Sequence, residues 1–134
     1  MQSMSKSSIL DMLAFVVMRA ELAIESTEEV RVYHDFLLSR DGMNLFDATC
    51  MRLQTIGEVM KNVDAGTEGC LLALYPEIPW RKICGLRNII SHEYLSIDPE
   101  IIFSVVKKHL RPMLISLKQI ISNIEAGHHD DLFL

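Results

Sequence analysis

The stretch Ser8–Ile24, SILDMLAFVVMRAELAI, carries its apolar residues at helical spacing. They recur three and four positions apart, which places them on one side of an α-helix. The alternation of apolar and polar residues that marks a half-buried strand is absent. The stretch therefore predicts a long amphipathic helix. Its apolar stripe consists of Ile9, Met12, Leu13, Val16, Val17 and Ala20.

Helical periodicity continues along the chain, and local signals divide it into segments. Ser26-Thr27-Glu28-Glu29 has the S-x-x-E form of a capping box. It predicts the start of a second helix, which would run to about Leu38 and be ended by Asp41-Gly42. A third helix is expected from about Leu45 to Val63, followed by a short one near Leu71–Leu74.

Prolines mark helix boundaries in the second half of the chain. A fourth helix is expected to begin at Pro79 or Trp80, because proline fits the first turn of a helix. Asp98-Pro99-Glu100 has the order of N-cap, first and second helical residue, and predicts a fifth helix. Pro112 lies inside that helix, so either the helix kinks there or a new one begins. Gly127 is expected to end the ordered part.

These segments predict an all-α fold, an antiparallel bundle of four to five helices. With 134 residues, the chain is expected to form one domain over residues 1–134, with residues 128–134 as a flexible tail. No apolar run reaches the ~18 residues of a membrane span. Three widely spaced cysteines, an odd number without a CxxC pair, indicate reduced thiols, so we expect a cytoplasmic protein. No metal site is expected.

Charge is unevenly distributed. The net charge of −5 argues against indiscriminate binding of nucleic acid. Residues 81–118, however, carry seven Lys and Arg against three Asp and Glu, so this segment is locally positive. Such a segment can hold a phosphate group in an otherwise acidic protein. Ordinary exposed helix charges explain the charge pattern alone equally well.

Residues 87–94, RNIISHEY, combine side chains that can act on a phosphate, at the end of the expected fourth helix. Arg87 and His92 are five residues apart, about 140° around an ideal helix, and so do not share a face. They can meet on one phosphate if the helix ends or distorts near Ser91, or if they converge from two chains of a dimer.

Each of these residues also has a structural interpretation. His92 could cap a helix C-terminus, and Arg87 could form an ion pair with Glu58 or Glu93. Tyr94 could be a half-buried aromatic residue. The hydroxyl of Ser91 is expected to bond locally to backbone.

The segment around the motif resembles a known family. Residues 75–114, YPEIPWRKICGLRNIISHEYLSIDPEIIFSVVKKHLRPML, are similar to the HepT branch of the HEPN superfamily, toxin ribonucleases that pair with minimal nucleotidyltransferase antitoxins. The family signature is Arg, four residues, His, any residue, Tyr, which Arg87, His92 and Tyr94 match. Residues 47–63, DATCMRLQTIGEVMKNV, resemble the family's third helix, including Gly57-Glu58.

The resemblance implies a dimer whose motif lines a cleft between the subunits, and metal-independent cleavage of RNA without a cofactor. It implies His92 as general base or acid and Arg87 as the residue that binds and stabilises the phosphate. Asn88 and Ser91 would support the site. Tyr94 occupies the place where the partner nucleotidyltransferase attaches AMP in this family.

Two other functions remain open at this point. The chain could be a non-catalytic HEPN adaptor that binds a nucleotidyltransferase without cleaving RNA. It could also be a ligand-binding helical bundle, which a monomer with a flat motif surface would favour.

Overall fold

The computed structural model describes residues 4–92 and 96–133, and within them all regular structure is helical. The all-α class is therefore confirmed. The elements are α1 (Lys6–Ser26), the 3-10 helix η1 (Tyr33–Phe36), α2 (Arg40–Gly66), α3 (Cys70–Ala73), α4 (Trp80–His92), α5 (Pro99–Ser104), the π-helix η2 (Val105–His109), α6 (Leu110–Glu125) and the 3-10 helix η3 (Asp130–Leu132).

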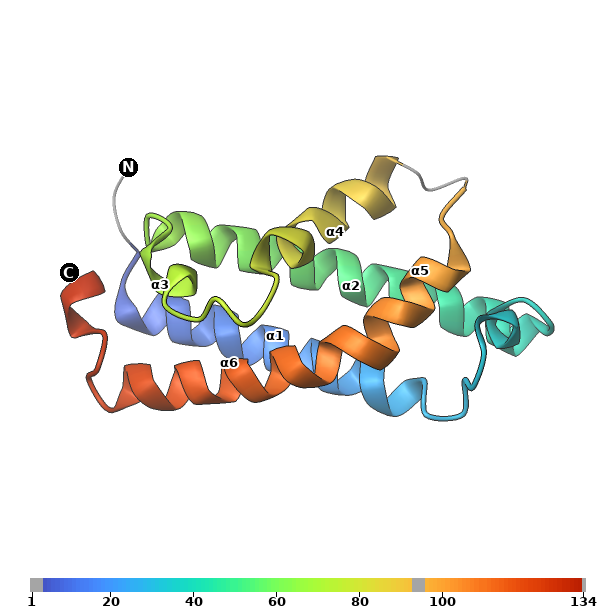
Figure 1. Cartoon of the computed structure of the whole chain (residues 1–134), viewed down its shortest axis with the longest axis horizontal. Helices are drawn as coiled ribbons and strands as arrows, with labels where there is room; N and C mark the ends of the chain where they lie inside the picture. The colour runs from blue at the N-terminus through green and yellow to red at the C-terminus, as the bar shows by residue number, and fades with distance from the viewer. Residues whose placement is uncertain (1–3, 93–95, 134) are drawn as a thin grey trace.

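The long helices form an elongated antiparallel bundle (Figure 1). α1 and α2 run side by side in opposite directions, and α6 returns along α1. α4 packs on α2. The two termini lie together at one end of the bundle, whereas η1 and α5 lie toward the other.

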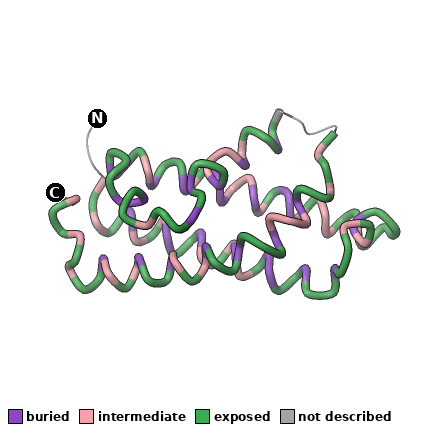
Figure 2. The backbone as a smooth tube through the Cα atoms, viewed as in Figure 1, coloured by how far each residue is buried: buried purple, intermediate pink, exposed green. Residues whose placement is uncertain are grey.

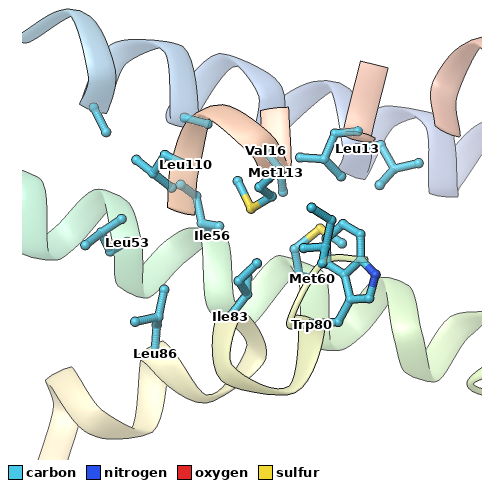
Figure 3. Packing of buried hydrophobic residues seen from close by; sticks show 14 of the residues in the cluster. Leu13, Val16, Leu53, Ile56, Met60, Trp80, Ile83, Leu86, Leu110 and Met113 are labelled. Atoms are coloured by element: carbon cyan, nitrogen blue, oxygen red, sulfur yellow. The ribbon is translucent and has the colours of Figure 1, made fainter. Parts of the chain in front are cut away.

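The buried positions of α1, α2 and α6 (Figure 2) belong to one hydrophobic core, part of which is shown in Figure 3. Most of the core side chains of these three helices have no exposed surface, whereas Ile83, Leu86 and Ile90 of α4 keep about 5% of theirs exposed. The stripe predicted for the first helix contributes part of this core. Its completely buried members are Ile9, Leu13, Val16 and Ala20.

The predicted second helix is wrong. Ser26 is the last residue of α1, and its hydroxyl donates a hydrogen bond to Leu22 O at 2.7 Å instead of capping a new helix. Thr27 is buried and donates to Ala23 O at 2.6 Å, so the same polar residues end a helix rather than begin one. Only the short η1 follows.

The next expected boundary is also displaced. Asp41 and Gly42, predicted to end a helix, lie in the first turn of α2. Ser39 is the N-cap, and its hydroxyl accepts a hydrogen bond from the backbone N–H of Gly42 at 2.9 Å. α2 therefore begins at Arg40, earlier than the apolar pattern indicates, because the cap decides where a helix starts.

The cap predicted for the fifth helix is confirmed. The Asp98 carboxylate accepts a hydrogen bond from the backbone N–H of Glu100 at 2.9 Å, and Pro99 is the first residue of α5. A π-helical turn, η2, then separates α5 from α6. Pro112, the third residue of α6, has no N–H and would crowd the carbonyl group of Lys108 in a regular α-helix. The wider π turn just before it is consistent with this crowding.

The C-terminal residues contact the start of the chain and the α3–α4 connection. Lys6 Nζ lies 2.8 Å from the Asp130 carboxylate, and the Tyr75 hydroxyl is 2.7 Å from His129 Nε2. Flexibility of this tail in solution stays a prediction.

The three cysteines are free thiols. Cys50 is buried, and burial raises the pKa of its thiol to about 12, so it stays protonated at neutral pH. Among the described residues, no helix has the length and apolar character needed to cross a membrane.

Candidate active site

The motif is carried by α4, which begins at Trp80 as predicted from the preceding proline. The indole N–H of Trp80 donates to Tyr75 O at 2.8 Å, which ties the start of the helix to the loop before it. Ile83, Leu86 and Ile90 are buried, and they recur at helical spacing. α4 therefore packs through one face, with the motif toward its C-terminal end.

A glycine sets how closely α4 approaches α2. A Cβ atom at Gly57 would lie 2.7 Å from Ile83 O and 3.0 Å from Arg87 N. Both are backbone atoms of α4, so they cannot move aside as the end of a side chain can. Gly57 thus allows α2 to contact the backbone of α4 at the motif arginine. The sequence pattern marked Gly57 only through its resemblance to the family's third helix.

Arg87 is loosely held beside this contact. Its Nε lies 3.9 Å from Glu58 Oε2, beyond hydrogen-bonding distance, and both side chains are about half exposed. The Nε atom itself is enclosed and has no hydrogen-bond partner among residues 4–92 and 96–133. An exposed ion pair of this kind contributes only ~0–1 kcal/mol. The structural interpretation of Arg87 as an ion pair with Glu58 is therefore a weak one, and the guanidinium can bind an added anion.

Ser91 makes a second polar contact between the same helices. Gln54 Nε2 on α2 donates to Ser91 Oγ at 3.0 Å. The hydroxyl oxygen of Ser91 thus accepts a hydrogen bond between helices, and its expected local bond to backbone stays a prediction. Gln54 lies four residues before Glu58, and Ser91 lies four residues after Arg87, so two polar contacts bracket the close approach at Gly57.

Sequence reasoning missed Gln54. The available signal was its position one helical turn before Glu58, which puts both side chains on the same side of α2.

The structure describes some of the remaining motif residues and not others. Asn88 is exposed on α4. His92 is the last residue of the helix, so positions 87 and 92 are about 140° apart around its axis, as for a regular helix. Glu93 and Tyr94 lie outside the described residues, so the predictions for Tyr94 stay predictions.

A largely apolar cleft of about 470 Å³ lies between α4 and the α5–η2 segment. Ile89 and Ile101, both nearly half exposed, line it. Gly85 also lines it, and a Cβ atom there would meet nothing within 4 Å. The helix that carries the motif thus leaves apolar surface uncovered within one chain.

The positive segment 81–118 does not form one cluster around Arg87. Lys107 Nζ instead donates to Thr27 O at 2.6 Å, at the C-terminal end of α1. Partial burial there lowers the pKa of Lys107, and the nearby charge of Arg111 lowers it further. Within residues 4–92 and 96–133, no three His, Cys, Asp or Glu side chains are grouped closely enough to hold a metal ion.

Comparison with known proteins identifies the family of the chain. A model of the family described as ribonuclease HepT-like matches residues 20–120. A protein of Thermococcus cleftensis named as a probable ribonuclease HepT is 32% identical over 105 residues, which cover 78% of this chain and 88% of that protein. The chain therefore belongs to the HepT-like ribonuclease family.

Two further relatives are also named as RNases. A candidate RNase of Methanocaldococcus jannaschii is 28% identical over 105 residues, 78% of this chain and 89% of its own length. Another, from Caldanaerobacter subterraneus, is 26% identical over 109 residues, 81% of this chain and 90% of its own. No solved structure matches the chain significantly. Ribonuclease is thus the class of enzyme that the family model and the relatives indicate together.

Proposed function

We propose that the chain is a metal-independent endoribonuclease that acts in the cytoplasm as the toxin of a toxin–antitoxin pair. The observation that supports this most is the weak hold on Arg87: its side chain is about half exposed and its Nε lies 3.9 Å from Glu58 Oε2, on the helix that extends to His92. A catalytic arginine must be free to exchange a weak protein contact for a phosphate.

The chemistry needs only groups of this kind. His92 would take the proton from a ribose 2′-OH or return one to the leaving 5′-oxygen, the role that histidine commonly has in acid–base catalysis. The 2′-oxygen then forms a bond to the neighbouring phosphorus as the bond to the 5′-oxygen breaks, which leaves a cyclic phosphate. Arg87 would oppose the charge that builds on the phosphate oxygens. Asn88 and Ser91 would support the site.

We place the complete site in a homodimer. A regular helix through His92 puts positions 87 and 92 on different sides of α4, which favours convergence from two chains over distortion of one helix. The apolar cleft beside α4 is the surface that a second copy would cover. Light scattering at micromolar concentration should give twice the chain mass of 15.3 kDa. A monomer would contradict the shared site.

The test of catalysis uses purified protein and a long single-stranded RNA. Arg87→Ala and His92→Ala should each lower the cleavage rate by about 10²-fold or more, while EDTA changes it little. Lys118→Ala, which removes an exposed cation from α6, is the control and should cleave like wild type. Cleavage that EDTA abolishes and His92→Ala retains would contradict the mechanism. A protein that cleaves no RNA but co-purifies with a nucleotidyltransferase would be the non-catalytic adaptor.

We also propose that a partner nucleotidyltransferase inactivates the enzyme by attaching AMP to Tyr94. Tyr94 is two residues from His92, so an added nucleotide would put bulk and negative charge where the RNA phosphate must bind. Arg87 would then be drawn to the attached phosphate.

Co-expression with the nucleotidyltransferase proposed as the partner, followed by intact mass measurement, tests this modification. Wild type should gain the mass of AMP and lose activity. Tyr94→Phe should keep its original mass and its activity. An equal mass increase in Tyr94→Phe would place the modification elsewhere.

A further inference from the structure

A second cleft, of about 330 Å³, lies between η1 and the α5–η2 segment. Its size is at the lower end of the ~300–1,000 Å³ typical of small-ligand sites, which suits one nucleotide rather than a folded partner. η1 and α5 lie in the half of the molecule away from the termini, toward which α4 also runs (Figure 1). The side chains that carry the inference are Tyr33, His34, Glu100, Phe103, Ser104 and Lys108.

One wall of the cleft is a fixed aromatic surface. The rings of Tyr33 and His34 stack with centroids 4.1 Å apart and planes inclined by 29°. The next residues of η1 hold them in place. The Asp35 carboxylate accepts the backbone N–H groups of Arg31 at 2.8 Å and Val32 at 3.2 Å.

Phe36 anchors the same short helix in the core. It is completely buried and packs edge-to-face on Phe46 of α2, with centroids 5.3 Å apart. Tyr33 and His34 therefore lie on a segment that is fixed both by the hydrogen bonds of Asp35 and by the buried ring of Phe36. Such a preformed surface can stack on a nucleobase without a large cost of ordering.

The cleft offers a lysine to an anionic ligand. Lys108 lines it, and Arg31 and Arg111 lie close enough to Lys107 to affect its pKa. Lys107 itself is occupied by Thr27 O, so it stabilises the end of α1 rather than facing a ligand. Three carboxylates balance these cations: Glu100 in the cleft, Glu28 near Lys107, and Asp35, which lies near His34 and Arg31. Lys108 is the lysine that lines the cleft itself, so it is the group that can bind a phosphate there.

We infer that this cleft is a subsite for single-stranded RNA, in which a nucleobase stacks against Tyr33, His34 and Phe103 while Lys108 binds an adjacent phosphate. Glu100 and Ser104 can then accept hydrogen bonds from a base amino group or a ribose hydroxyl. The inference rests on the proposed function, because it makes the cleft an extension of the substrate path beyond the cleavage site.

Binding and cleavage are measured separately, so that the subsite and the nuclease can fail independently. Binding of a fluorescent 12-nucleotide RNA is followed by anisotropy in a His92→Ala background, where the RNA stays intact. Tyr33→Leu should weaken binding about tenfold, the size of one lost stack, and Tyr33→Phe should bind normally. Lys108→Gln should reduce the slope of log K against log salt by about 0.7, one phosphate contact, while Lys118→Gln leaves it unchanged.

Cleavage with an otherwise wild-type chain provides the second readout. Tyr33→Leu should raise KM for the long RNA and leave kcat unchanged, and it should not affect cleavage of a dinucleotide, which is too short to reach the subsite. Circular dichroism checks that the fold is retained.

The outcomes separate the two ideas. RNA that binds through Tyr33 but is never cut by wild type would remove the proposed nuclease and keep the subsite. Normal cleavage with equal affinity in Tyr33→Leu, Lys108→Gln and Lys118→Gln would overturn the subsite and keep the nuclease. Absence of RNA binding by the His92→Ala protein would also overturn the subsite.

Discussion

The two sides of α2 are built differently. Toward α1 and α6, α2 contributes side chains that are completely buried, such as Leu53, Ile56 and Met60. Toward α4, it contributes a glycine in backbone contact and two exposed polar contacts. α4 packs through one face and leaves apolar surface on another.

The difference separates stability from positioning. Burial of apolar side chains is tolerant of small shifts, whereas a catalytic arginine must be placed to within about 1 Å. A close backbone contact at Gly57, with polar contacts on either side, fixes the position of α4 although it adds little buried surface. The α1–α6 side supplies the stability that lets α4 remain partly uncovered.

The largest effects are expected from replacing one leucine on each side of α2, which tests whether stability and positioning are separate. Leu117→Ala in α6 and Leu86→Ala in α4 should each destabilise the fold by about 2–5 kcal/mol, with Leu86, which keeps 5% of its surface exposed, nearer the lower value. Urea unfolding measures this. Per folded molecule, Leu117→Ala should cleave RNA like wild type and Leu86→Ala should not, because only Leu86 supports the motif helix. Equal activities of the two variants would mean that the core on the α4 side of α2 has no special role in positioning the motif.

A matched pair of glycines tests the close approach. Gly57→Ala puts a methyl group 2.7 Å from Ile83 O, and we expect a loss of about 1–3 kcal/mol in stability and about 10²-fold in cleavage rate. Gly85→Ala makes the same change in α4 where no atom lies within 4 Å, and should stabilise the helix by about 0.5–1 kcal/mol. Thermal unfolding of both variants tests this. Similar changes in unfolding temperature would show that the backbone contact at Gly57 is unimportant.

The polar contacts should have smaller effects. Gln54→Leu removes the hydrogen bond to Ser91 and should lower the cleavage rate several-fold, at a stability cost of about 0.5–1.5 kcal/mol. Glu58→Gln removes a charge 3.9 Å from Arg87 and should change stability by less than about 1 kcal/mol. Steady-state kinetics on both variants distinguishes positioning from stability. A Glu58→Gln variant that is strongly destabilised would show that the ion pair is structural.

The smallest expected effect concerns the α1–α2 connection and depends on pH. Backbone N–H groups of Arg31 and Val32 hold the pKa of Asp35 below its usual value of 3.8. A depressed pKa contributes stability that is present above the unfolded pKa and lost as pH falls through the folded one. The stability difference between wild type and Asp35→Ala should therefore be present at pH 7 and shrink below about pH 4. A difference that grows on acidification would contradict the assignment.

Features that depend on a few neighbouring residues could be predicted from the sequence. The Asp98 cap and the start of α4 after Pro79 follow from local backbone chemistry, and the stripe of α1 follows from helical spacing. The motif residues Arg87, Asn88 and His92 lie on α4 as predicted.

Features that depend on tertiary contacts could not. Ser26 and Thr27 fit a capping box, but Arg52 of α2 donates to the Ser26 hydroxyl at 3.0 Å and Thr27 is buried, so the helix ends there. The contact between Gln54 and Ser91 joins residues 37 positions apart, and it depends on how α2 and α4 are aligned along each other.

The central claim is that α4 carries half of a site that two chains complete, and mixing two inactive variants tests it most directly. Arg87→Ala and His92→Ala are each purified, mixed in equal amounts, dissociated in mild urea and allowed to reassociate. If Arg87 of one chain acts with His92 of the other, half of the dimers are mixed and half of the sites in each mixed dimer are intact. Cleavage should then recover to about a quarter of the wild-type rate, whereas unmixed variants treated in the same way stay inactive. Mixed dimers, verified by mass, that remain as inactive as either parent would contradict the account.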